Sequence, residues 1–192
     1  MHASTVIDRV GRRLFGSPLL RNSIRGEIVE EIVAMALEPS WELCSGDWGA
    51  CDLVHPASKL RIQVKQSAAR QSWHLAEPAP ASPRFSIAPK TGRWEEGDSW
   101  VAEPGRNAEV FIFAWHPLTG AAADHRDPQQ WLFHVVPERD LPLQKSISLA
   151  SVRSLAPPVT FTALASAVRA AEIKVLTQKN RGAVRHGPDS GP

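Results

Sequence analysis

The order of the predicted elements indicates an α/β fold, in which a mixed β-sheet is flanked by helices within a single domain. A helix comes first, a hairpin and further strands follow, and another helix comes last; this order is typical of a sheet covered by helices. The 192 residues suffice for one domain whose core needs no disulfides. Hydrophobic residues make up 43% and charged residues 22% of the chain, which excludes a wholly disordered or fibrous protein.

Three regions differ in composition along the chain. Residues 1–22 are rich in arginine and only weakly periodic, so we expect a loose arm with a single short helical turn. Residues 23–175 carry the periodic apolar segments and form the predicted domain. Residues 176–192 combine Gly, Pro and charged side chains, a composition that favours disorder.

The first clear helix is predicted over residues 23–37. Ser23 suits the N-cap position because its hydroxyl can accept a hydrogen bond from an unpaired backbone N–H. Apolar residues then recur at spacings of three and four, which places them on one helical face. They are Ile28, Val29, Ile32, Val33, Ala36 and Leu37. The helix has to end before Pro39.

A β-hairpin is predicted over residues 50–64. Apolar and polar residues alternate from 60 to 65, which is the period of a strand with two different faces. Residues 50–54 form a short apolar run around Asp52. A proline and a serine between the two segments favour a turn.

The rest of the chain is predicted from similar local signals. A short helix is expected over 67–75, a long irregular loop broken by prolines over 78–107, and a final helix over 160–171. Residues 121–128, which include His125, are polar and contain a proline, so we expect a solvated loop there. Apolar runs predict three more strands: 109–115, 131–136 and a short edge strand at 146–149.

Charge and cysteine content narrow the function classes. The formal net charge is only +2, so the chain is not coated in positive charge to hold nucleic acid indiscriminately. Cys44 and Cys51 cannot make a disulfide framework, and without a nearby histidine they are a poor zinc site. We therefore expect a reducing, cytoplasmic location. No apolar run approaches the length of about 20 residues that a transmembrane helix needs.

One local stretch is more basic than the rest. Residues 53–76 contain no acidic residue. The basic residues there are Lys59, Arg61, Lys65 and Arg70. A short basic stretch is most often a solvated face, but Lys59, Arg61 and Arg70, together with Gln71, are also candidates for contacts with nucleic acid. For Trp73 we favour packing over stacking on a base, because a tryptophan buries a large area.

The same stretch holds the best chemical motif of the chain. Residues two apart on a strand point to the same side, so Gln63 and Lys65 project together, and Asp52 can meet them across the hairpin. A carboxylate, a second oxygen ligand and a lysine suit metal-assisted hydrolysis of a phosphodiester. Mg²⁺ prefers oxygen ligands and needs only one or two carboxylates, and the bound metal activates water.

These segments resemble the PD-(D/E)xK nuclease superfamily, which has the restriction-endonuclease-like fold. The likeness is to small bacterial members with the pattern R-G-x-x-x-E-x-x-V-x-x-A-L, then W…D-L, then I-E-V-K-x-S-A-x-x-Q-x-W. The matching segments here are 25–37, then Trp48 with Asp52 and Leu53, then 62–73. Together they span about a quarter of the chain, and the later strands match only by pattern.

The resemblance implies a role for each matched residue. Asp52 is the main metal ligand, Gln63 the second side-chain ligand, and the backbone carbonyl of Val64 a third. Lys65 handles the attacking water, and Glu30 on the helix completes the acidic cluster. The metal is Mg²⁺ or Mn²⁺, the substrate is nucleic acid, most simply DNA, in a defence or repair role, and a homodimer is compatible with this class.

Gln63 departs from the pattern and keeps an alternative open. The superfamily more often has glutamate at this position, and an amide removes one negative charge from the site. The alternative is a nuclease-fold protein that is catalytically weak or inactive and binds nucleic acid or a protein partner. A third hypothesis is a small-molecule enzyme that uses the Trp- and His-rich distal half, which a deep apolar pocket remote from Lys65 would support.

Overall fold

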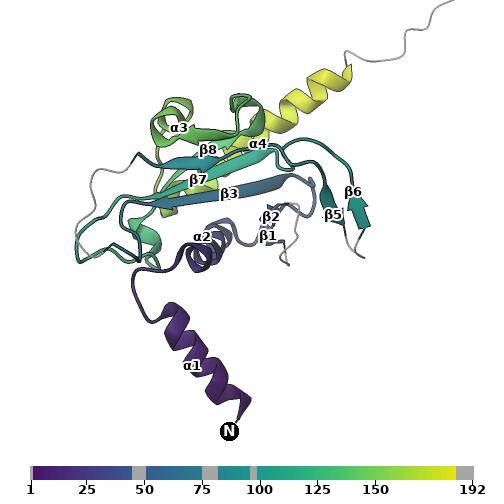
Figure 1. Cartoon of the computed structure of the whole chain (residues 1–192). Coiled ribbons are helices and arrows are strands. Elements are labelled where there is room, and N and C mark those ends of the chain that lie inside the picture. The colour runs from purple at the N-terminus through teal and green to yellow at the C-terminus, as the bar shows by residue number, and fades with distance from the viewer. Residues whose placement is uncertain (1, 45–50, 75–81, 96–98, 185–192) are drawn as a thin grey trace, which may run out of the picture.

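The computed structural model describes residues 2–44, 51–74, 82–95 and 99–184. A five-stranded sheet lies at the centre, in the order β1-β2-β3-β7-β8 (Figure 1). Its strands are β1 (Glu42–Leu43), β2 (Leu53–Val54), β3 (Arg61–Ala68), β7 (Val110–His116) and β8 (Leu132–Pro137). β3 and β7 are parallel, whereas the other neighbours are antiparallel. The predicted mixed sheet and the hairpin of β2 and β3 are thereby confirmed.

Helices cover the sheet on both faces within one domain. The helices α2 (Asn22–Leu37) and α4 (Phe161–Val184) pack on one face, against apolar side chains of β3 and β7 such as Ile62 and Ile112. The other face carries α3 (Leu149–Leu155) and a small sheet over Phe111 and Phe113. Every residue of β7 is buried. Both faces of this strand are covered, which explains why its sequence is a nearly continuous apolar run without alternation.

The strand β3 is longer than predicted. The sequence suggests a helix over 67–75, but β3 continues through Ala68, which pairs with His116. The physical reason is the parallel ladder with β7, which satisfies the backbone groups on one edge of β3 from Ile62 to Ala68. Residues 69–74 form turns instead of a helix, and Leu75 lies outside the described residues.

The predicted irregular loop over 78–107 contains three short strands. β4 (Arg84–Ser86) pairs with β9 (Ser146–Ser148), and β5 (Arg93–Glu95) pairs with β6 (Ser99–Val101). The partner of β4 lies some sixty residues away in sequence, so a local pattern cannot reveal the pairing. β9 confirms the predicted edge strand, whereas α3 directly after it was not predicted.

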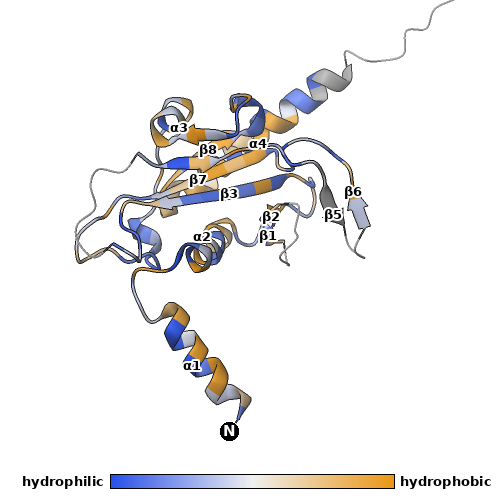
Figure 2. Cartoon of the chain, in the orientation of Figure 1, coloured by the Kyte–Doolittle hydropathy of each residue, from blue (hydrophilic) through white to orange (hydrophobic). Residues whose placement is uncertain are grey.

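Both ends of the chain are more helical than predicted. The arm 1–22 contains α1 (Ala3–Phe15), which extends away from the sheet and has no buried residue (Figure 1). Apolar and polar residues share its surface (Figure 2). α4 runs on to Val184, so the expected disorder of 176–184 is corrected. No proline interrupts it, and the packed Ala171 and Val175 carry the helix past its predicted end.

No helix within the described ranges has both the length and the apolar character needed to cross a membrane.

Candidate nuclease site

Backbone hydrogen bonds hold Asp52 between two strands. Its N–H donates to the carbonyl of Ile62 (2.9 Å), and its carbonyl accepts from the N–H of Cys44 (2.9 Å). These bonds extend the β1–β2–β3 ladder by one residue and direct the carboxylate towards β3. There Asp52 Oδ2 accepts hydrogen bonds from the N–H of Val64 (2.6 Å) and from Gln63 Nε2.

The edge of β3 beside this carboxylate has no strand partner among the described residues beyond Ile62. The carbonyl of Ile62 and the N–H of Val64 both point towards Asp52. Because successive residues of a strand direct their peptide groups to opposite edges, the carbonyl of Val64 points to the same edge as its N–H. A carboxylate, a side-chain amide and a backbone carbonyl therefore meet at this edge.

Lys65 completes the group on β3. It lies two residues after Gln63 and so points to the same side of the strand, where Gln63 is only 8% exposed. Burial lowers the pKa of Lys65, while the charges of Asp52 and Glu30 act in the opposite direction. Burial also raises the pKa of Asp52, against its hydrogen bonds and the charge of Lys65. The two charged groups thus interact where little water screens them.

Glu30 reaches the same region from α2. Its side chain is half-buried, and burial together with the charges of Asp52 and Glu27 raises its pKa to about 7. The charge of Lys65 acts in the opposite direction. The structure therefore brings together all four residues that the sequence singled out for chemistry, Glu30, Asp52, Gln63 and Lys65.

Lys90 is a member of this group that the sequence did not reveal. Burial has the largest effect on the pKa of Asp52 and on that of Lys65, and the positive charge of Lys90 lowers both pKa values. Backbone hydrogen bonds with Gly105, of 2.7 and 3.0 Å, hold Lys90 in an isolated bridge. The side chain is exposed. No local signal in a proline-broken segment could have placed this lysine beside a site formed by residues 30–65.

The four residues proposed to contact nucleic acid do not form one surface. Lys59 occupies the turn before β3, with a left-handed φ of 55°. Arg61 is paired with Glu109 (Nη2 to Oε1, 3.3 Å). Arg70 lies past the other end of β3, where Nη1 donates to the carbonyl of Gly120 (2.7 Å).

Gln71 is part of an internal network around a buried arginine. Arg25 is 1% exposed and donates to amide oxygens of Gln66 (2.6 Å), Gln71 (2.7 Å) and Asn22 (2.8 Å). Burial lowers its pKa to about 10. The other end of the Gln71 amide donates to the carbonyl of Ala68 (2.6 Å). This network joins α2 to the end of β3.

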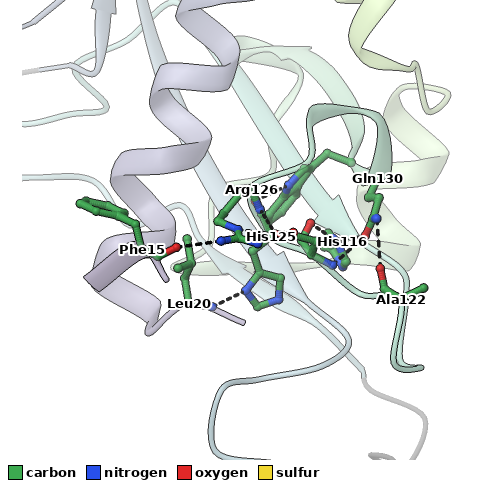
Figure 3. A network of polar contacts seen from close by, with 9 residues as sticks. Phe15, Leu20, His116, Ala122, His125, Arg126 and Gln130 are labelled. Carbon is green, nitrogen blue, oxygen red and sulfur yellow. Dashed lines mark hydrogen bonds and ion pairs between the residues drawn. The ribbon is translucent and has the colours of Figure 1, made fainter. Parts of the chain in front are cut away.

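The segment 121–128 is solvated only in part: Ala121, Ala122 and Arg126 are exposed, as its composition suggests, whereas Ala123 and His125 are buried. His125 is fully buried and accepts a hydrogen bond from the N–H of Leu20 (3.0 Å), while its other nitrogen donates to the carbonyl of Arg70 (3.0 Å). Figure 3 shows how it meets the linker after α1. Trp73 also departs from expectation, because it is 62% exposed instead of packed. Neither residue joins the candidate site.

The oxygen donors at the edge of β3 suit a hard cation. Among the described residues, no three His, Cys, Asp or Glu side chains gather into a metal-binding cluster. The candidate site instead offers Asp52, the amide of Gln63 and the carbonyl of Val64, with Glu30 nearby. Mg²⁺ accepts such a set because it keeps several water ligands and is commonly bound through one or two carboxylates.

A cavity of about 370 Å³ lies elsewhere, between the end of α2 and α4. Its lining includes Glu38, Arg169 and Glu172. A pocket with these charged walls differs from the deep apolar pocket that the small-molecule hypothesis requires.

Comparisons with known proteins leave the family open. No family model matches the chain, and no curated protein matches it. Among solved structures, the bacterial homing endonuclease I-Ssp6803I is similar over 67% of this chain and 77% of its own, with 19% sequence identity and a TM-score of 0.38. A likeness at this level establishes neither a family nor an activity.

Proposed function

We propose that this protein is a metal-dependent nuclease that hydrolyses phosphodiester bonds, with DNA as the substrate and a restriction-endonuclease-like fold. The observation that carries the proposal is the Asp52 carboxylate, which the N–H of Val64 and the amide of Gln63 hold beside Lys65, at the edge of β3 that no described strand pairs beyond Ile62. The resemblance of residues 25–73 to the PD-(D/E)xK pattern supports the same function independently of this geometry.

Several residues at the edge of β3 would together bind the cation. Asp52, the carbonyl of Val64 and the side-chain oxygen of Gln63 would hold Mg²⁺ or Mn²⁺, with Glu30 as an additional carboxylate. Gln63 now directs its nitrogen at Asp52; rotating the terminal amide by half a turn brings its oxygen to that position. The bound ion would polarise a phosphate oxygen and activate water.

Lys65 supplies the positive charge next to the reacting phosphate. Lys65 is half-buried, so its interaction with an anionic transition state is stronger than it would be in water. Asp52 opposes the effect of burial on the pKa of Lys65 and so helps to keep the lysine charged. Lys90, whose side chain is exposed, adds a second cation that can meet the incoming phosphate backbone.

The direct test is a cleavage assay with the purified full chain on plasmid and single-stranded DNA, with Mg²⁺ or Mn²⁺. We expect cleavage that requires the metal and falls at least about 100-fold in Lys65→Ala. Lys174→Ala, an exposed lysine on α4, is the matched control and should retain full activity. Cleavage that survives Lys65→Ala would contradict the proposed site.

A second candidate function follows from Gln63. Among the described residues, the amide leaves Asp52 as the single carboxylate in direct contact with this edge of β3. A site too weak for catalysis would leave a protein that binds nucleic acid. An absence of cleavage with any divalent metal, combined with retained binding to DNA in a mobility-shift assay, would favour this function.

A further inference from the structure

Two thiols lie directly beside the candidate site. The Sγ atoms of Cys44 and Cys51 are 2.9 Å apart. The N–H of Cys44 donates to the carbonyl of Asp52, so the ladder that positions the metal-binding carboxylate also brings the two cysteines together. Both cysteines are free thiols in this structure.

We propose that Cys44 and Cys51 form a reversible disulfide that controls the position of Asp52. An S–S bond is roughly 2.05 Å long, so the two sulfur atoms need to approach by less than about 1 Å. The β1–β2 pairing already holds the two chain segments in antiparallel register, so a bond at this point is compatible with that pairing.

Formation of the disulfide from two thiols needs an oxidant, and the oxidant in this proposal is a peroxide. Cys44 is only partly buried, whereas Cys51 is 7% exposed, so the sulfur of Cys44 meets the peroxide first. It attacks one oxygen, the O–O bond breaks, and the thiol proton leaves with the departing oxygen as water, which gives a sulfenic acid. The sulfur of Cys51 then displaces the hydroxyl as a second water. The two thiols are oxidised by two electrons, and one peroxide is reduced.

The consequence for Asp52 follows from its neighbour in the chain. Closing the bond would draw Cys51 towards Cys44, and the adjacent Asp52 would shift with it and strain its hydrogen bond of 2.6 Å from the N–H of Val64. A displacement of about 1 Å at a catalytic group can cost roughly 100-fold in rate. This part of the inference rests on the proposed nuclease function, whereas formation of the disulfide does not.

Mass spectrometry tests the disulfide itself. The full chain is treated with hydrogen peroxide, the remaining thiols are alkylated, and the protein is digested with trypsin. Residues 26–59 contain no Lys or Arg before Lys59, so both cysteines fall in one tryptic peptide. We expect this peptide to lose two hydrogen atoms, to escape alkylation, and to return to the dithiol with dithiothreitol. When this oxidised peptide is cleaved again before Asp47, between the two cysteines, the fragment with Cys44 and the fragment with Cys51 should stay linked.

Cys44→Ser is the control, because this partly exposed position tolerates the change, and it should abolish the mass loss. Two alkylated cysteines after peroxide treatment, a sulfinic acid, or disulfides between chains would overturn the proposal.

Cleavage measured on the same samples tests the control of Asp52. We expect activity to fall at least about tenfold on oxidation and to return on reduction, with no such response in Cys44→Ser. A disulfide that leaves the rate unchanged would overturn the effect on Asp52. If the reduced protein cleaves no substrate, the nuclease function fails, and the mass measurement still decides whether the disulfide forms.

Discussion

Gln63 limits the negative charge that the edge of β3 can offer a cation. Its side chain is 8% exposed and hydrogen-bonded to Asp52, so a carboxylate at position 63 would stand directly against that of Asp52. Two carboxylates this close repel each other without a cation and bind one more tightly.

The change Gln63→Glu therefore has two expected effects. Without metal, it should lower the melting temperature, because of the repulsion from Asp52. With Mg²⁺, it should preserve or raise cleavage and lower the metal concentration needed for half-maximal rate by roughly tenfold, or about 1.4 kcal/mol of binding free energy. Cleavage titrated against Mg²⁺, with thermal unfolding of the same samples, measures both. An inactive variant with unchanged metal affinity would argue against Gln63 as a ligand.

Arg25 is the second residue whose role a substitution can define. It is a buried cation that donates to three amide oxygens instead of a carboxylate. Arg25→Met keeps the volume and removes the donors, leaving acceptors on α2 and β3 unpaired. We expect a loss of about 2–3 kcal/mol in the free energy of unfolding, measured with urea.

Arg169→Met, at an exposed arginine of α4, is the matched control and should change stability by no more than about 0.5 kcal/mol. An Arg25→Met variant as stable as the wild type would show that water satisfies the three amides equally well.

At the scale of elements, α1 differs from the other α-helices in the described part of the chain, because none of its residues is buried. Val6, Ile7 and Phe15 are 50%, 69% and 41% exposed. The helix contributes little apolar burial, so its removal should cost little. The linker after it behaves differently, since Leu20 is 1% exposed and its N–H bonds His125.

Deletion of residues 2–16 should therefore change the free energy of unfolding by less than about 1 kcal/mol. Leu20→Ala in the full chain should cost about 3 kcal/mol, because it opens a cavity in a packed region. Urea unfolding of the two variants gives the comparison. A deletion as destabilising as Leu20→Ala would mean that α1 packs against the domain in solution.

At the scale of the whole molecule, three buried histidines make stability depend on pH. His116 and His134 each donate one ring N–H to an oxygen. Their second nitrogens, His116 Nδ1 and His134 Nε2, are buried without a partner among the described residues. His125 uses its second nitrogen to accept the N–H of Leu20. All three rings are therefore neutral. Burial is the largest cause of the lowered pKa of each ring, and it brings the pKa of His125 to about 4.

The sign of the effect follows from proton binding. Between the ordinary pKa of histidine, about 6.5, and the lowered folded values, the unfolded chain binds more protons than the folded one, so stability rises with pH. We expect the free energy of unfolding to be greatest above about pH 6.5 and to decline as the pH falls towards 4. His125 should account for up to roughly 3 kcal/mol of this decline.

His125→Asn keeps an acceptor for the N–H of Leu20 and has no basic nitrogen. In urea unfolding from pH 4 to 8, it should flatten the pH dependence of stability. A slope equal to that of the wild type would assign the dependence to other groups.

Elements with strong local signals could be predicted from the amino-acid sequence. The apolar spacing of 23–37 predicted α2, the alternation of 60–65 predicted β3, and the apolar run of 109–115 predicted β7. The placement of Asp52 against Gln63 and Lys65 could also be predicted, because a hairpin pairs residues that are close in sequence and the register follows from the alternation.

Contacts between segments that are far apart in the sequence could not be predicted and became visible in the three-dimensional structure. The approach of Lys90 to Asp52, the amide network of Arg25, the burial of His125 and the strand β4 all join segments that are nearly forty or more residues apart. A local pattern reports which side of an element is apolar, but it does not report which distant segment will cover that side. That choice is made by packing and hydrogen bonding over the whole domain, which also extended β3 along β7 where the local sequence indicated a helix.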